Sequence, residues 1–403
     1  MNEYQVLMVS AAFAFAYSLV ATRLERTPVN GALVYVALGL FLGPAGLGFV
    51  KFNFGSQGMR WLAEVTLAVV LFTDSATSNL SVLRRYEFIP ARLLLIGLPL
   101  TILFGFGLAV LLFPNSGFFS LALLATMLAP TDAALGQAVV SNPKVPEAVR
   151  ESLNVESGLN DGICVPVMLL FLSMAEGETG RWGVLGDGVL FSLKAIGIGG
   201  AVGLGLGFIG SRAVQLSQKR GWTGGSWMEI PVVALALLCF ASAQWLGGSG
   251  FIASFIGGMT FGALTQSHKQ ALLEAAEGTG NALALITWFL FGTLLFEYPF
   301  DGLTWQVLAY ALGSLTVVRI LPVFLSVLGL HLRFDTRLFL GWFGPRGLAS
   351  IVFAVMVADA AIPGGEVVVS TAAWTVVLSI VLHGLSANPM AGIYGRRVGD
   401  QKV

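Results

Sequence analysis

Apolar runs of about the length that spans a bilayer recur along the whole chain, with only short polar breaks between them. Of the 403 residues, 56% are hydrophobic and 11% are charged, and the mean hydropathy is +0.82. Soluble globular domains carry about 25% charged residues. Backbone that crosses lipid must satisfy its own hydrogen bonds, and helices do so within one segment. The sequence therefore predicts an all-α polytopic membrane protein.

About 20 apolar residues are needed for one helical span. By that measure the chain contains about thirteen transmembrane helices, at 4–22, 29–49, 60–80, 88–113, 117–140, 148–175, 187–211, 229–246, 250–265, 279–297, 303–330, 336–360 and 367–390. Only a Gly-Gly-Ser-Gly stretch at 247–250 divides the eighth from the ninth. The first of these is expected to be a retained span, because no signal-peptide features precede it.

The loop charges give an orientation. When residues within five positions of a loop are counted with that loop, sixteen of the 22 Lys and Arg residues belong to odd-numbered loops or follow the last span, three belong to even-numbered loops or the N-terminus, and three lie deeper within spans. Basic residues concentrate in cytoplasmic loops. The N-terminus is therefore expected outside and the C-terminus in the cytoplasm, with 393–403 as a short cytoplasmic tail.

Two spans contain a proline beside a charged residue. The fifth carries Ala-Pro-Thr-Asp at 129–132, and the twelfth carries Gly-Pro-Arg-Gly at 344–347. Interrupted helices in corresponding places of two halves are typical of inverted-repeat transporters. We expect a single transporter domain with crossing broken helices, in which 1–175 and 229–392 form two inverted six-helix repeats and 176–228 form a linker helix and loop.

The sixth span carries polar groups at bilayer depth, namely Glu156, Ser157, Asn160 and Asp161. Residues four apart share a helix face, so the four are expected on one stripe. Ionisable groups inside a membrane are costly and usually mark an ion or proton pathway. This stripe is therefore a candidate transport site.

The broken fifth span adds further oxygen atoms, because Asp132 and Thr131 lie at its interruption. Hard oxygen ligands suit a hard cation. A buried carboxylate such as Asp161 holds either a proton or a cation, and this mutual exclusion is the minimal mechanism of exchange. We predict that the carboxylates of Asp161 and Asp132 with the oxygens of Ser157 and Thr131 form the cation site, with Asn160 beside them.

Three further charged residues lie within apolar segments. Arg319, in the eleventh span, is predicted to form a structural ion pair with Glu156 that ties the two repeats together. Asp74, in the third span, either lines a cytoplasmic funnel, acts as a distant ligand or is a solvated residue near the helix end. Arg346 is expected to shape the site, either by capping the broken twelfth helix or by opposing the dipole of its partner. The three histidines are too scattered to predict a metal site.

The motifs at 129–132 and 344–347, together with Glu-Ser-Gly-Leu-Asn-Asp-Gly at 156–162, resemble those of the NhaP/NHE-type cation–proton antiporters in order and spacing. The resemblance implies thirteen spans, a dimerisation domain, a mobile core and a homodimer. It also implies that Asp161 binds the cation and the proton, with Ser157, Asp132 and the Thr131 carbonyl as ligands. Relatives often have Glu at the position of Asp74, which bears on cation preference.

The resemblance also bears on stoichiometry. Relatives with two adjacent acids at 160 and 161 move more than one proton per cation, whereas this chain has Asn160 and one acid. The expected function is electroneutral exchange of Na⁺ or Li⁺ for H⁺ across a membrane, and the compact form points to a bacterial inner membrane.

Other functions stay open. The nearest alternative is K⁺/H⁺ exchange by the same machinery, and a cation channel is less favoured because it needs no protonatable exchange site. A symporter of a larger solute would need aromatic groups beside the acids, and few are present. No nucleophile–base pair indicates an enzyme. No cofactor and no nucleic acid partner are expected; the partners are monovalent cations, protons, the lipid bilayer and a second copy of the chain.

Overall fold

The computed structural model describes residues 3–24, 27, 29–50, 57–78, 88–177, 185–222, 227, 230–265, 269–295 and 303–398. Among these residues the regular secondary structure is helical, and no strand is present. Every apolar run found in the sequence contains helix. The predicted all-α architecture is therefore confirmed, whereas the number of membrane crossings stays a prediction.

The first half of the chain contains α1 (Glu3–Leu24), α2 (Gly31–Leu42), α3 (Gln57–Thr77), α5 (Ile89–Arg92), the π-helix η1 (Leu93–Gly97), α6 (Leu98–Leu112), α7 (Phe118–Met127), α8 (Ala133–Val140) and α9 (Glu147–Gly177). The helix α10 (Leu185–Lys219) follows at the position predicted for the linker.

The second half contains α11 (Ile230–Trp245), α12 (Gly250–Leu264), α13 (Lys269–Leu294), α14 (Trp305–Leu315), α15 (Val317–Ser326), α16 (Phe334–Trp342), α17 (Leu348–Ala360) and α18 (Gly365–Val398). Because α18 runs to Val398 without a break, part of the predicted tail continues the last helix. The division into two repeats and a linker stays a prediction.

Within the described residues, five helical segments are long and apolar enough to cross a membrane by length and composition: Ile89–Leu112, Glu147–Glu176, Val189–Lys219, Trp305–Ser326 and Gly365–Val398. Shorter apolar helices accompany them. The two spans predicted to be broken are among the segments that do not reach this length as single helices, because each is divided into two parts.

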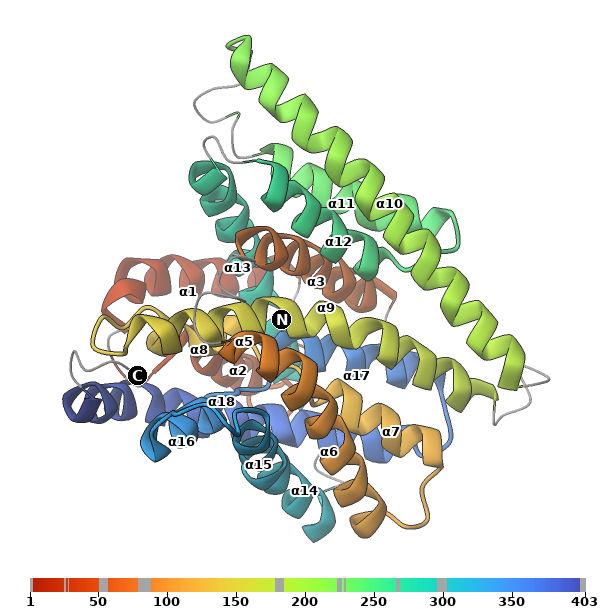
Figure 1. Cartoon of the computed structure of the whole chain (residues 1–403), viewed down its shortest axis with the longest axis vertical. Coiled ribbons are helices and arrows are strands. Elements are labelled where there is room, and N and C mark those ends of the chain that lie inside the picture. The colour runs from red at the N-terminus through yellow and green to blue at the C-terminus, as the bar shows by residue number, and fades with distance from the viewer. Residues whose placement is uncertain are drawn as a thin grey trace.

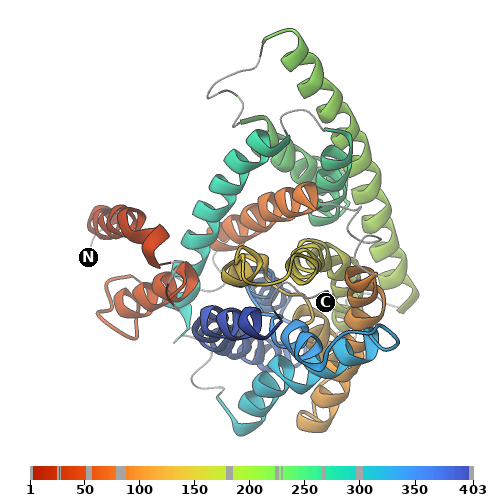
Figure 2. The same cartoon turned by 60° about the vertical axis from the view of Figure 1, so that its left-hand side comes forward.

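The helices form two groups (Figure 1). In one group α3 packs against α11, α12 and α13, and α10 lies along α12 on its outer side. In the other, α7 and α17 pack against α18, and α14 and α15 pack against α6. The helix α9 contacts α3, α10 and α12 on one side and α7 and α8 on the other, so it lies between the groups. Figure 2 shows α1 and α2 at the edge of the first group.

Two further spans are irregular, and both contain a proline. The π-helix η1 ends two residues before Pro99, and its wider turn lets the N–H of Leu98 bond to the Leu93 carbonyl. A proline ring clashes with the carbonyl four residues earlier in a helix, and a π-turn relieves such a clash. The other span is interrupted at Thr316, between α14 and α15, and Pro322 lies within α15 six residues later. The interruption at Thr316 was not predicted, because only prolines next to charged residues were considered.

Candidate functional site

The two broken helices cross at their non-helical segments. Residues 128–132 separate α7 from α8, and residues 343–347 separate α16 from α17. At the crossing, the N–H of Asp132 donates to the carbonyl of Pro345 over 2.8 Å. Each proline removes an amide donor and so frees helix carbonyls, which is tolerated where protein lines the space. The sequence therefore predicted both interruptions, and the structure brings them together.

The Asp132 carboxylate lies against the N-termini of both helices that leave the crossing. Its Oδ1 accepts from the N–H of Leu135 in α8 over 2.9 Å, and its Oδ2 accepts from the N–H of Leu348 in α17 over 2.8 Å. Helix N-termini carry unpaired N–H groups and a partial positive charge, which an anion stabilises. Gly347 permits this approach, because a Cβ there would overlap the carboxylate. Asp132 therefore couples the two broken helices.

Arg346 supplies a positive charge at the opposite end of the crossing. Its guanidinium is fully buried and donates through Nη1 to the carbonyls of Ala129 (2.9 Å) and Pro130 (3.1 Å), at the C-terminal end of α7. A cation there complements the negative end of the helix dipole. Arg346 thus bonds to the partner broken helix, and the site-shaping role expected for it stays a prediction.

The predicted stripe on α9 divides between two partners. Asn160 donates through Nδ2 to the Thr131 hydroxyl over 2.7 Å, and Ser157 Oγ lies 2.9 Å from the same hydroxyl. These contacts join the middle of α9 to the break in the fifth span. Glu156 instead faces Arg319 of α15.

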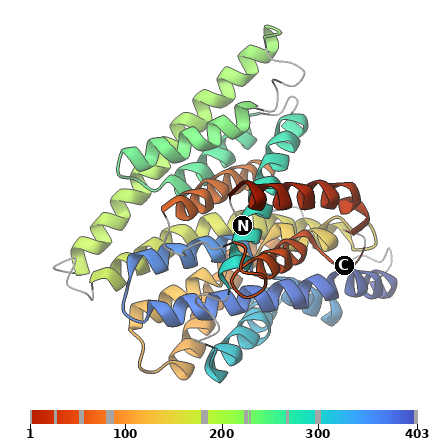
Figure 3. The same cartoon turned by 180° about the vertical axis from the view of Figure 1, so that it is seen from behind.

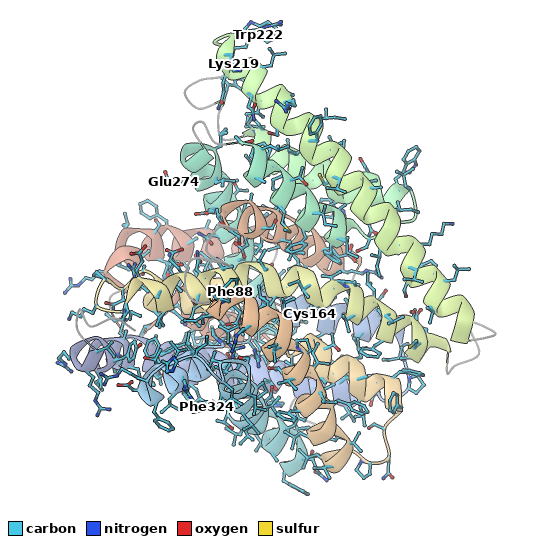
Figure 4. All side chains as sticks on the ribbon, in the orientation of Figure 1. Phe88, Cys164, Lys219, Trp222, Glu274 and Phe324 are labelled. Atoms are coloured by element: carbon cyan, nitrogen blue, oxygen red, sulfur yellow. The ribbon has the colours of Figure 1, made fainter. Side chains whose placement is uncertain are left out.

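Asp161 follows Ser157 by one turn on α9, and the residue is 8% exposed. It is within electrostatic range of the carboxylates of Asp132 and Asp74. Among the described residues, none donates a hydrogen bond to the Asp161 carboxylate. A buried carboxylate that lacks donors is suited to take a proton or a cation as its partner. Figure 4 labels Cys164, which lies on α9 three residues after Asp161.

Glu156 and Arg319 form a bidentate pair. The two nitrogen–oxygen distances are 2.6 and 2.8 Å, and each side chain is 1% exposed. Such fork-to-fork pairs are the strong form of the ion pair. Gly344 lets the guanidinium pass the break of the twelfth span, because a Cβ there would lie 2.5 Å from Arg319 Nε. The pair thus joins α9 to α15 beside the crossing.

Asp74 comes from the other group of helices. It is partly buried on α3, which packs against α9, and it lies within electrostatic range of Asp132 and Glu277. The structure therefore brings it towards the acids of the crossing without placing it in contact with them. Within the described residues, no cluster of three or more His, Cys, Asp or Glu side chains forms a resident metal site.

The residues that sequence reasoning missed are Ser379 and His383 on α18. Both are buried and both bond to the break in the twelfth span. Their signal was a polar pair four residues apart in a largely apolar span, the same spacing that identified the stripe on α9.

Comparison with known proteins identifies the family. The family model described as "Sodium/hydrogen exchanger, transmembrane" matches residues 9–392. The chain belongs to this family. The sodium/hydrogen exchangers are membrane transporters, so the prediction of an integral membrane antiporter fold and the suspected family are both confirmed.

Curated relatives in the family differ in the cation in their names. The chain is 27% identical over 395 residues to the K⁺/H⁺ antiporter NhaP of Alkalimonas amylolytica, covering 97% of this chain and 67% of that protein. It is 24% identical over 386 residues to the K⁺/H⁺ antiporter NhaP2 of Shewanella sp. strain ANA-3, with 95% and 66% covered. The chain spans about two thirds of the length of these relatives. An Na⁺/H⁺ antiporter of Schizosaccharomyces pombe is 25% identical over 407 residues, with 92% and 86% covered.

The fold is also found in solved structures. An electron-microscopy structure of the sodium proton antiporter MjNhaP1 from Methanocaldococcus jannaschii superposes with a TM-score of 0.76 at 20% identity, covering all of both chains. A structure of the same protein at pH 8 gives 0.74, with 95% of this chain and 100% of that chain covered. The antiporter fold is thereby shown.

Proposed function

We propose that this chain exchanges Na⁺ or Li⁺ for H⁺ across the membrane by alternating access, with the cation and the proton competing for Asp161. The observation that carries the proposal is Asp161, a residue that is 8% exposed, lies within electrostatic range of Asp132 at the crossing of the two broken helices, and receives no hydrogen bond from the described residues. A proton or a cation satisfies that charge equally, and the two exclude each other. Opening the site to one side at a time then couples their movements.

The ligand set of the proposal comes from the residues around the crossing. The hydroxyls of Ser157 and Thr131 lie 2.9 Å apart on the side of α9 that meets the break. With the Asp161 carboxylate and the backbone oxygen of Thr131 they supply hard oxygen atoms of the kind that Na⁺ and Li⁺ prefer. Asn160 holds the Thr131 hydroxyl in place through its amide N–H.

A surface cavity of about 180 Å³ between α8 and α9 is lined by Gln137, Val140, Ser141, Arg150, Glu151 and Asn154. Asn154, Ser157 and Asp161 follow at helical spacings of three and four, which places them on one face of α9. In the proposed orientation, with the N-terminus outside, this end of the fifth span faces the cytoplasm. The cavity is therefore the proposed cytoplasmic route to Asp161.

The proposed stoichiometry is one cation for one proton. Position 160 is an amide that is engaged with Thr131, so it carries no exchangeable charge. Both oxygens of Asp132 accept main-chain N–H groups of helix N-termini, which assigns that acid a structural role in our account. Asp161 remains as the exchanging carboxylate.

K⁺/H⁺ exchange is the second candidate, and one observation favours it: two of the bacterial relatives are named K⁺/H⁺ antiporters. The same residues would serve either ion, because cavity size and ligand field decide between Na⁺ and K⁺. We further propose a homodimer in a bacterial cytoplasmic membrane as the working assembly. Asp74 is proposed to line the route between α3 and α9.

Proton flux in proteoliposomes tests the proposal. Vesicles with an imposed pH gradient receive Na⁺, Li⁺ or K⁺ in turn, and the voltage is clamped with an ionophore for an ion other than the one tested. Na⁺- and Li⁺-driven proton flux that is insensitive to voltage supports electroneutral Na⁺/H⁺ exchange. A response to K⁺ selects the second candidate, whereas cation conductance without proton flux selects a channel and overturns the proposal.

A further inference from the structure

Two side chains of α18 bond to both ends of the break in the twelfth span. The helix α18 crosses the back of the molecule (Figure 3). Ser379 and His383 lie one turn apart on it, and they are 0% and 1% exposed. Neither belongs to the cation site described above, and neither contacts Asp161. Their partners are Trp342, the last residue of α16, and Arg346, just before α17.

The hydrogen bonds form a directed chain. The main-chain N–H of Arg346 donates to Ser379 Oγ over 2.6 Å, so the proton of that hydroxyl is available to donate onward. Ser379 Oγ lies 3.2 Å from His383 Nδ1, and His383 Nε2 lies 2.9 Å from the carbonyl oxygen of Trp342. A carbonyl only accepts, so Nε2 carries the proton that is donated to Trp342. Nδ1 lies 3.2 Å from both the hydroxyl and the carbonyl oxygen of Ser379, and in the neutral imidazole it accepts from the hydroxyl.

Neighbouring contacts fix the same segment. The Trp342 indole donates through Nε1 to Ser386 Oγ over 2.9 Å, and its ring lies 5.2 Å from the His383 ring. The end of α16 is thus held at its carbonyl and at its side chain by consecutive turns of α18. The start of α17 is held at the Arg346 amide.

The held segment carries the groups that set the crossing. Arg346 donates to the carbonyls of residues 129 and 130, and the N–H of Leu348 donates to Asp132. A shift of the segment moves Asp132 and Thr131 relative to α9, and therefore relative to Asp161. Losing one partner of a buried hydrogen bond leaves the other unsatisfied, which costs about 1–3 kcal/mol unless the backbone moves.

We infer that His383 and Ser379 are positioning residues of the exchange site: through Trp342 and Arg346 they set the path of residues 342–348, and through that segment they set the affinity of the site for the cation. This inference rests on the proposed exchange at Asp161. Its structural part, that the pair fixes the break, is measurable without transport.

The variants separate hydrogen bonding from packing. His383→Leu keeps an apolar side chain in the space but removes both ring nitrogens. His383→Gln places an amide N–H where Nε2 donates to Trp342. Thr375→Ala is the matched control, because Thr375 is a fully buried hydroxyl on α18 that bonds within its own helix to the Thr371 carbonyl.

Two readouts are made on each variant in the full chain. In proteoliposomes, His383→Leu is expected to raise the apparent KM for Na⁺ about five- to tenfold with a smaller change in maximum rate, and His383→Gln is expected to return it towards the wild-type value. In hydrogen–deuterium exchange, amides of residues 343–348 are expected to exchange faster in His383→Leu than in His383→Gln or Thr375→Ala.

The outcomes distinguish the two claims. Equal effects of Leu and Gln at position 383 in both readouts overturn the positioning role, as does unchanged amide protection of 343–348 in His383→Leu. If wild-type protein moves no protons in response to any cation while the deuterium pattern is as expected, the proposed function is contradicted. The structural claim, that His383 and Ser379 fix the break in the twelfth span, is then still supported.

Discussion

Asp132 and Leu348 are 216 positions apart in the chain, yet the Leu348 N–H donates to Asp132 Oδ2 over 2.8 Å. The other oxygen of the same carboxylate caps α8 through Leu135. One acid therefore stabilises the N-termini of both half-helices that leave the crossing. Arg346 does the reverse at the carbonyl end of α7. The crossing is held by opposite charges on opposite helix ends.

Asp132→Asn is expected to destabilise the protein and not merely to slow exchange. An amide offers one acceptor oxygen in place of two, and its NH₂ group faces a backbone donor. Hydrogen bonds to charged groups contribute about 1.5–3 kcal/mol each. Thermal unfolding in detergent should show a clear loss for Asp132→Asn and little for Asp359→Asn, whose carboxylate is exposed and paired with Arg60. Wild-type stability of Asp132→Asn would contradict the capping role.

The two arginine–carboxylate pairs should differ sharply in what they contribute. Removing Arg319 by mutation to Ala leaves Glu156 as an uncompensated buried charge, which typically costs about 3–5 kcal/mol. Arg60 pairs with Glu64 and Asp359, but its side chain is 41% exposed, and exposed pairs contribute about 0–1 kcal/mol. The yield of folded protein and its thermal midpoint should fall for Arg319→Ala and Glu156→Gln and hold for Arg60→Ala. Stable, active Arg319→Ala and Glu156→Gln would refute the structural pair.

Gly347→Ala tests the close approach at the crossing. A methyl group there would overlap the Asp132 carboxylate, which must then leave the N-terminus of α17. We expect reduced folded yield and reduced exchange. Gly392→Ala is the control, because α18 is helical there and no atom lies within 4 Å of the added Cβ. If Gly347→Ala matches Gly392→Ala in folded yield and in exchange, the position of the Asp132 carboxylate does not depend on the close approach at Gly347.

Ser157→Ala should weaken cation binding selectively. The Ser157 hydroxyl is part of the proposed ligand set and lies 2.9 Å from the Thr131 hydroxyl. The apparent KM for Na⁺ should rise more than the maximum rate falls, because the proton-binding acid is untouched. Initial rates over a range of Na⁺ concentrations check this. A fall in maximum rate with an unchanged KM would remove Ser157 from the ligand set.

Sequence reasoning located the crossing because each break leaves a local signal, a proline beside a charge in an apolar run. It also singled out Asp161, since a buried acid in a membrane helix needs a functional reason, and the role of Asp161 stays a prediction. The assignment of Asp132 to the cation site stays a prediction as well, and sequence reasoning did not foresee that both of its oxygens accept from helix N-termini. That arrangement depends on α17 arriving beside α8, which no local pattern encodes.

Other features were missed for the same reason. The carbonyls of Ala129 and Pro130 could not be identified from the sequence as the partners of Arg346. His383 was considered only as a metal ligand, and its partner is the end of a helix some forty residues earlier. Contacts between distant segments are set by tertiary packing, so they became visible only in the fold.

The most direct test of the account is proton flux in proteoliposomes containing Asp161→Asn. The amide is nearly the same size as the carboxylate but binds neither a proton nor a cation as an acid does. The account predicts a folded, inserted protein with no Na⁺-, Li⁺- or K⁺-driven proton flux, beside a wild type that responds. Ordinary exchange by Asp161→Asn would contradict the central claim that the cation and the proton share this carboxylate.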